Sequence, residues 1–309
     1  MRDRALLTGV LVLLGLGWGL CIPLSKIAVS GGYQPLGLIF WQVLIVALFL
    51  GTINFLRRRG LPLSRATGGG PVIWRTYLVI ACLGALLPDV AYYRAAQHLP
   101  AGVLAILISS VPMFAFPIAL MLGNDRFQAL RIAGLLAGMA GIFLLIGPEA
   151  SLPDAAMAAF IPLALIAPLC YASEVNYVAR WGTAGLDPIQ ALTGASIVAA
   201  LIALPLAVLS GQWIDPRPPW GLADAALLAN AVVHALVYAG YVWLTGRAGS
   251  VFAAQASYLV TLFGMLWSMG LLSERYSGYV WAALGLMILG LALVQPRPRL
   301  PPAPTPSAP

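Results

Sequence analysis

Apolar residues fill this chain in long runs, and the lengths of those runs are the first guide to its fold. The 309 residues contain ten such runs, separated mostly by short polar connections. Most are about 20 residues long, which is the length of α-helix that crosses a bilayer core about 30 Å thick. The pattern therefore predicts an all-α polytopic membrane protein with ten transmembrane helices, near residues 6–28, 36–55, 76–97, 102–122, 131–147, 156–180, 188–210, 223–246, 250–272 and 279–294.

Polar residues interrupt the apolar pattern most clearly between residues 92 and 122. The polar residues 92–94 end one apolar run and are followed by the short break 98–102. Two serines and two prolines then interrupt the next run: Ser109, Ser110, Pro112 and Pro117. Carbonyls that proline leaves unpaired are tolerated at membrane depth where the helix meets other protein or lines a cavity. We therefore expect a helical hairpin beside an aqueous path through the membrane.

Composition agrees with a membrane protein and narrows the kinds of partner. Hydrophobic residues make up 61% of the chain and charged residues 9%, against roughly 45–50% and 25% in soluble domains. The net charge of +7 arises from 16 Arg and one Lys, and no patch of arginines and aromatic residues lies outside the apolar runs. We expect the basic residues to orient the chain against membrane lipid, with no nucleic-acid partner. The three cysteines, Cys21, Cys82 and Cys170, have no metal-type spacing, so we expect neither a metal nor a disulfide.

The distribution of basic residues predicts the orientation of the helices. The first run follows Arg2 and Arg4 but has no clean small-x-small cleavage site, so we interpret it as a membrane helix rather than a signal peptide. With the N-terminus in the cytoplasm, 13 of the 17 basic residues fall on the cytoplasmic side. Because such residues concentrate in cytoplasmic loops, we expect both termini and the flexible 56–75 linker to be cytoplasmic.

The two halves of the chain carry a weak internal repeat. When residues 103–146 are shifted forward by 149, Asp125-Arg126-Phe127 falls on Glu274-Arg275-Tyr276 between two predicted helices. Five helices per half is an odd number, so the second copy must enter the membrane in the opposite direction. We expect an inverted five-plus-five repeat, with residues 1–147 as the first copy, 148–294 as the second, and 295–309 as a disordered Pro-rich tail.

Several motifs in this arrangement resemble the EamA-type family of the drug/metabolite transporter superfamily. They are Trp18-Gly19 with Lys26, Tyr92-Tyr93 before Leu99-Pro100-Ala101-Gly102, the segment from Ser109 to Pro112, and the two acid-Arg turns. The turn after the fourth helix is usually Gly-Glu-Arg in this family, whereas Gly123-Asn124-Asp125-Arg126 is one residue longer. The resemblance covers about 6–294 and implies a ten-helix secondary transporter of the inner membrane. Many members export amino acids and other small metabolites, but the family does not fix a substrate.

Ionisable side chains within the predicted helices are the first candidates for a site. Each costs about 2.5–3.5 kcal/mol at mid-membrane unless it is solvated or paired. Three qualify: Asp89, Glu174 and His234. Asp89 could instead be a structural partner of Arg94, and His234 a neutral imidazole bonded to a backbone carbonyl. Glu174 has no basic residue within one turn of its own helix, so we expect it to bind a proton or the amine of a substrate.

Uncharged polar groups complete the candidate substrate-binding or coupling residues: Tyr92, Tyr93, Ser109, Asn230 and Tyr258. Each has an ordinary alternative, because amides at membrane depth commonly join helices and tyrosines commonly anchor the membrane interface. Gln42, Asn176 and Gln255 are interpreted as such helix–helix contacts. Gly134 and Gly138 form a small-residue face that favours close helix packing, within the chain or in a homodimer.

The sequence favours a transporter over an enzyme. It contains no HExxH or CxxC spacing and no Gly-rich phosphate loop, so we expect no catalytic activity and no cofactor. The combined interpretation is secondary transport, in the export direction, of a small polar or amphipathic, amino-acid-like metabolite by alternating access, with proton coupling through Glu174 as one option. The alternative within the same superfamily is a flippase for a lipid or a lipid-linked substrate.

Overall fold

The computed structural model describes residues 2–61, 70–146 and 152–294, and within them the regular structure is helical. The α-helices are α1 (Arg2–Ser30), α2 (Pro35–Leu56), α3 (Gly70–Ala81), α4 (Leu87–Ala96), α5 (Ala101–Ile108), α6 (Val111–Met121), α7 (Ala129–Ile146), α8 (Ile161–Ala164), α9 (Ile166–Trp181), α10 (Pro188–Leu209), α11 (Leu222–Ala248), α12 (Ser250–Ala253), α13 (Ala256–Leu272) and α14 (Gly278–Val294). A π-helix, η2 (Cys82–Leu86), joins α3 to α4, and a 3-10 helix, η3 (Ala155–Phe160), precedes α8.

Many of these helices suit a membrane in length and composition. Eight continuous helical stretches of the described chain are long and apolar enough to cross a bilayer, and α13 and α14 are shorter apolar helices. Large apolar side chains face outward, such as Leu13 at 65% exposed, Leu48 at 64% and Phe143 at 63%. An apolar surface of this extent is expected against lipid rather than water. The prediction of an all-α membrane protein is confirmed at this level.

The linker expected at 56–75 is shorter than predicted, because α3 already begins at Gly70. Proline is tolerated in the first turn of a helix, where its missing N–H has no partner to lose, so Pro71 is compatible with helix at this position. Two arginines at the other end of the linker form ion pairs. The guanidinium groups of Arg57 and Arg59 lie 3.3 and 2.9 Å from the Asp187 carboxylate at the start of α10.

Three helices that were predicted as continuous contain breaks. The run expected at 156–180 divides into η3, α8 and α9, and Pro162 and Pro168 fall on either side of the division at Leu165. The run at 250–272 divides between α12 and α13. The run at 102–122 breaks at Ser109 and Ser110, whose hydroxyls donate to carbonyls three residues back at 2.6 Å. These hydroxyls supply partners for carbonyls at membrane depth, as such a break requires.

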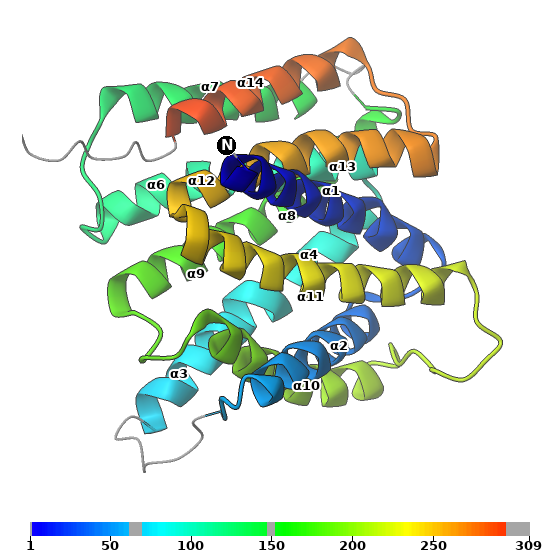
Figure 1. Cartoon of the computed structure of the whole chain (residues 1–309). Coiled ribbons are helices and arrows are strands. Elements are labelled where there is room, and N and C mark those ends of the chain that lie inside the picture. The colour runs from blue at the N-terminus through cyan, green and yellow to red at the C-terminus, as the bar shows by residue number, and fades with distance from the viewer. Residues whose placement is uncertain (1, 62–69, 147–151, 295–309) are drawn as a thin grey trace, which may run out of the picture.

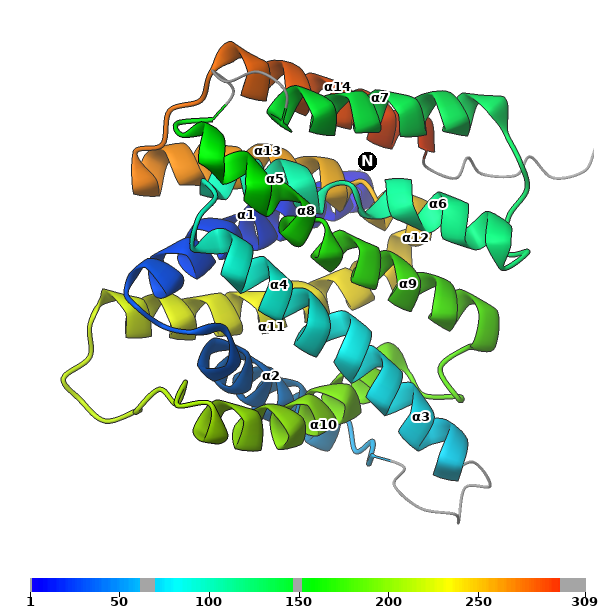
Figure 2. The ribbon, with the colours of Figure 1, turned by 180° about the vertical axis from the view of Figure 1, so that it is seen from behind.

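Helix α1 lies within the bundle, where it packs against α11 and α13, and α2 packs against α10. Both views place α7 and α14 side by side along one edge, with α3 and α10 toward the opposite edge (Figures 1 and 2). The α7–α14 contact brings the two backbones close together. A Cβ on Gly134 would lie 2.8 Å from the carbonyl oxygen of Gly290, and one on Gly290 would lie 2.9 Å from the amide nitrogen of Gly138. The small-residue face predicted on this helix is therefore occupied within the chain.

Candidate functional site

A cavity of about 480 Å³ lies in the middle of the bundle. Its wall is built by side chains from α1, α2, α3, η2, α4, the region of the α5–α6 break, α9, α10, α11 and α13, so segments from both halves of the chain contribute. The size is in the range that holds a small-molecule ligand. Seven of the eight residues predicted as candidates line it: Asp89, Tyr92, Tyr93, Ser109, Glu174, Asn230 and His234. The eighth, Tyr258, is not among the lining residues.

The cavity also contains polar and aromatic residues that sequence reasoning did not select, namely Trp18, Ser25, Gln42, Tyr171, Ser196, Tyr238, Tyr241, Ser257 and Thr261. A signal for some of them was present. Asn230, His234, Tyr238 and Tyr241 recur every three or four residues along α11, which is the spacing of one helix face. On α13 the corresponding stripe is Ser257, Val260 and Thr261. Tyr258 is adjacent in sequence to this stripe but lies about 100° around the helix from Ser257.

Asp89 is buried in the cavity wall on the first turn of α4. Its carboxylate accepts a hydrogen bond of 3.0 Å from the hydroxyl of Tyr171 on α9. Arg94, the partner that the sequence suggested, is exposed, and no ion pair joins it to Asp89 within the described residues. Asp89 is thus a carboxyl group satisfied by one neutral donor.

Glu174 lies one turn after Tyr171 on the same face of α9 and points toward the π-helix η2. A Cβ on Gly84 would lie 2.7 Å from one carboxylate oxygen of Glu174 and 3.2 Å from the other. A side chain at position 84 would therefore force the carboxylate to shift. No hydrogen-bond donor of the described chain reaches this carboxylate, in contrast to Asp89. Single-turn π-helices within α-helices are frequently found at functional sites, and the unpaired Glu174 carboxylate lies against this one.

A hydrogen-bonded network joins four helices at another part of the wall. The side-chain oxygen of Gln42 on α2 accepts from the Tyr93 hydroxyl and from the Asn230 amide, the latter at 3.2 Å. The same Asn230 amide lies 3.3 Å from the hydroxyl oxygen of Ser25 on α1. The Oδ1 atom of Asn230 is buried and has no partner. Asn230 therefore fixes the wall through its donor while its acceptor is left open.

His234 and Trp18 form an aromatic part of the wall. Their ring centroids are 6.5 Å apart with the edge of one facing the other, and Trp18 also lies 5.2 Å from the ring of Tyr241. The described structure has no hydrogen bond from His234 to a backbone carbonyl, which was the alternative the sequence left open. By contrast, Asn176 behaves as expected for a helix–helix contact, because its amide donates to the Ala115 carbonyl of α6 at 2.9 Å.

One end of the bundle is closed around the turn between α4 and α5. Ala95, Ala96, Leu99 and Ala101 are completely buried there. The Lys26 ammonium donates to the Ala96 carbonyl at 2.6 Å. The Glu274 carboxylate accepts from the backbone N–H groups of Ala101 and Gly102, at 2.8 and 3.1 Å. A carboxylate at the N-terminus of a helix is favoured both by these free N–H groups and by the helix dipole.

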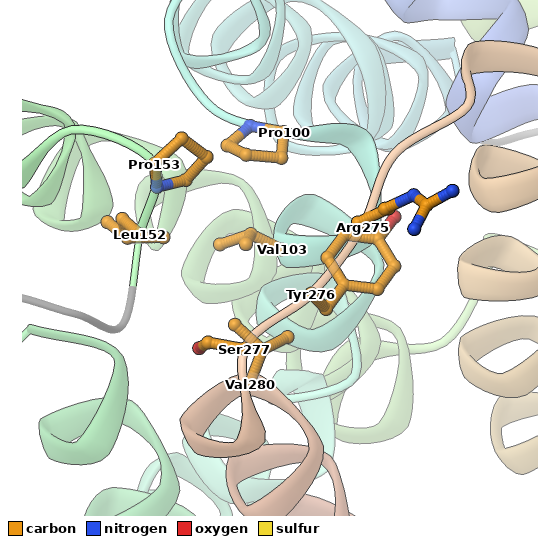
Figure 3. Close-up of a pocket in the computed structure, with 8 residues that line it drawn as sticks. All are labelled: Pro100, Val103, Leu152, Pro153, Arg275, Tyr276, Ser277 and Val280. Carbon is orange, nitrogen blue, oxygen red and sulfur yellow. The ribbon is translucent and has the colours of Figure 1, made fainter.

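Tyr276 supports the same contact, since its hydroxyl donates to Glu274 at 2.6 Å. Burial and the neighbouring Glu274 carboxylate raise the pKa of Tyr276, so its hydroxyl stays protonated. Beside this contact lies a second, smaller cavity of about 260 Å³, lined in part by Pro100, Val103 and Leu152. Figure 3 shows these apolar side chains around the opening and the Arg275 guanidinium directed away from Leu152.

Comparison with known proteins agrees with this architecture. Residues 7–147 and 159–295 match the model of the EamA-like transporter family. The uncharacterized inner membrane transporter YedA of Escherichia coli strain K12 is 24% identical over 302 residues, which cover 95% of this chain and 92% of YedA. The YedA proteins of Escherichia coli O6:H1 and O157:H7 give the same values.

A protein of known crystal structure has the same fold, with a TM-score of 0.63 at 16% identity over 93% of this chain and 96% of its own. This likeness concerns the fold alone. The two family matches together span most of the chain, and they confirm the resemblance that the motifs around Lys26, Tyr92 and Glu274 suggested. The chain belongs to the EamA-like transporter family.

Proposed function

We propose that this protein is a secondary transporter of the inner membrane that exports a small polar or amphipathic, amino-acid-like metabolite by alternating access. The observation that carries the proposal is the central cavity of about 480 Å³, with polar side chains from both halves of the chain and a tightly packed closure at one end. Alternating access requires a binding site between the two halves that is open to one side of the membrane and then to the other.

The packing of the helices supports an inverted repeat. If the second half is a copy of the first in the opposite direction, α1 corresponds to α9, α11 to α4, and α13 to α6. The contacts of α1 with α11 and α13 then have counterparts in the contacts of α9 with α4 and α6. The same correspondence relates α2 to α10 and α7 to α14, so each of these two contacts is its own counterpart. Two such halves can rock about the cavity between them.

The distribution of basic residues supports a choice of the cytoplasmic side. Arg57, Arg59 and the exposed Arg180 lie at the end of the bundle opposite the α4–α5 turn. By the positive-inside rule this end faces the cytoplasm, together with both termini, and the closed end faces outward. The described conformation is then one in which the outward side is sealed.

Glu174 is the group we propose for coupling. It is an acid in the cavity wall without a hydrogen-bond donor, and the other titratable groups on that wall include Asp89, His234, Tyr171 and Tyr238. An unpaired carboxylate exchanges a proton or a ligand cation more readily than one that is fixed by an arginine. The coupling step is therefore expected to be lost when Glu174 cannot ionise.

The proposal is tested with purified protein in sealed vesicles. Solutes that stabilise the protein in a thermal-shift screen are loaded on one side, and counterflow of the labelled solute is measured without ATP. We expect exchange that Glu174→Gln abolishes or makes insensitive to a pH gradient, while the variant still inserts into the membrane. An obligatory requirement for ATP would refute secondary transport. Movement of labelled lipid between leaflets, without movement of any polar solute, would instead support a flippase.

A further inference from the structure

The charges on the cavity wall are all of one sign. The lining residues include two carboxyl side chains, Asp89 and Glu174, and neither a lysine nor an arginine is among them. His234 is the one basic side chain in the lining set, and it lies against the Trp18 ring. A ligand with its own carboxylate would therefore meet two acids and no fixed cation. Bringing an unpaired charge to a buried site of the same sign is costly.

Two groups of the wall are hydrogen-bond acceptors without a donor. The two oxygens of Glu174 have no donor within the described chain, and the Oδ1 atom of Asn230 is buried without a partner. A carboxylate and an amide oxygen can only accept. The molecule that satisfies them must bring N–H or O–H donors, and a protonated amine brings two or three on a positive charge.

The start of α6 is a poor competing site for an anion. Helix α6 begins beside the cavity at Val111 and Pro112, and the N-terminus of a half-helix can bind an anion when its N–H groups are free. Proline has no N–H to offer. The amides of Ser110, Met113 and Phe114 already donate to carbonyls of the same chain segment. The start of α6 thus has few N–H groups left to bind a carboxylate.

Aromatic rings form much of the remaining wall. Trp18, Tyr92, Tyr171, Tyr238 and Tyr241 all line the cavity together with apolar residues of α1, α2 and η2. Aromatic faces stabilise a cation by about 0.5–2 kcal/mol each, and their rings pack equally well against an apolar body. This combination of free carboxylate, acceptor amide and aromatic wall is chemically suited to an amphipathic amine.

We propose that the cavity binds an organic ammonium cation, with its N–H groups on the Glu174 carboxylate and its apolar body against the aromatic wall. The inference rests on the proposed transport function and narrows its substrate from an amino-acid-like metabolite to an amine without a free carboxylate. Gly84 acts as a positioning residue. Its missing side chain lets the Glu174 carboxylate lie in the wall at η2, where an added Cβ would displace it.

The experiment measures binding of charge-matched ligands by calorimetry on the purified full-length protein. Each series has one body in three forms, as amine, amino acid and acid: tyramine, tyrosine and 3-(4-hydroxyphenyl)propanoate, and isopentylamine, leucine and 4-methylpentanoate. We expect the amine to bind at least tenfold more tightly than the other two forms in at least one series. Glu174→Gln should weaken amine binding at least tenfold, and Gly84→Ala should weaken it while keeping the charge. Asp215→Asn removes an exposed acid outside the cavity and should leave binding unchanged.

The opposite results overturn the inference. They are tighter binding of an amino acid or acid than of its amine, absence of binding by both amines, or unaltered amine binding in Glu174→Gln. Uptake into vesicles separates this inference from the transport proposal. Exchange of a zwitterion but not of its amine would refute the amine inference and leave secondary transport standing. Absence of exchange for every solute that binds would count against transport itself.

Discussion

The contact between Glu274 and the first turn of α5 should control which side of the membrane the cavity faces. In the described conformation this carboxylate on the loop after α13 accepts both N–H groups at the start of α5, and Leu99 and Ala101 beside them are fully buried. If the outward end opens during transport, α5 must separate from the end of α13, and these two bonds must break. Removing them by Glu274→Ala is therefore expected to favour the outward-open state.

The structure sets the size of the effect. Hydrogen bonds to a charged group contribute about 1.5–3 kcal/mol, and loss of a helix-capping side chain costs about 0.5–2 kcal/mol. Water can replace part of the loss once the end is open, so a net change of about 1–2 kcal/mol is reasonable. That change corresponds to a shift of roughly five- to thirtyfold in the ratio of the two states.

The assay is the labelling rate of a single cysteine in the cavity. The native Cys21, Cys82 and Cys170 are replaced, and Ser25→Cys is introduced at the buried Ser25 on α1. An impermeant maleimide is then applied from the outer face of sealed vesicles. We expect labelling to accelerate about five- to thirtyfold in Glu274→Ala and by a smaller factor in Tyr276→Phe, which removes one hydrogen bond to the carboxylate.

Arg275→Ala is the matched control, because it removes a charge from the same loop without touching the Ala101 and Gly102 amides. Its labelling rate should equal that of the parent protein. Equal rates in Glu274→Ala and in Arg275→Ala would refute the reasoning, since the contact would then hold no free energy that distinguishes the two states.

Three further predictions concern stability and orientation. Gly134→Leu should lower the melting temperature, since its Cβ meets the Gly290 carbonyl at 2.8 Å and overpacking costs about 1–3 kcal/mol; Gly285→Leu, with open space around it, should not. Asp187→Ala should destabilise the protein by about 0.5–2 kcal/mol, because Asp187 caps α10 and pairs with Arg57 and Arg59. Partial burial acts to raise the pKa of Asp187. Hydrogen bonds from the Gln190 backbone amide and from both arginines outweigh this effect, so the pKa is lowered overall. The stability difference between wild type and Asp187→Ala, followed by thermal unfolding against pH, should therefore be full above about pH 4 and shrink as the pH falls further; a difference that grows on acidification would contradict this. An impermeant maleimide outside intact cells should label Ser210→Cys and spare Gly60→Cys, and the reverse pattern would refute the orientation.

The sequence predicted the helices well because membrane thickness sets their length. Much of the candidate site could also be predicted from the sequence, since an acid such as Asp89 or Glu174 within an apolar run has few places to lie except a cavity. Positions within a helix were harder. The division of the ninth predicted helix between α12 and α13 falls at Ala254 and Gln255, residues that carry no proline or glycine signal.

Contacts between distant segments could not be predicted from sequence at all. The π-helix at Cys82–Leu86 contains ordinary helix-forming and small residues, and its relation to Glu174 depends on how α9 crosses it. Tyr171 as the partner of Asp89 is a contact between residues 82 positions apart. Arg94 is close in sequence but lies on the exposed side of α4, so local spacing favoured the wrong partner.

The length of α11 has a consequence for how the cavity lies in the membrane. This helix has 27 residues, with Gly221 before its first turn and Gly249 after its last. At a rise of about 1.5 Å per residue it extends about 40 Å, which exceeds a hydrocarbon layer about 30 Å thick. A helix longer than the layer accommodates the difference by tilting. The cavity-lining face of α11 is therefore expected to cross the membrane obliquely, so that Asn230 and Tyr241 differ in lateral position as well as in depth.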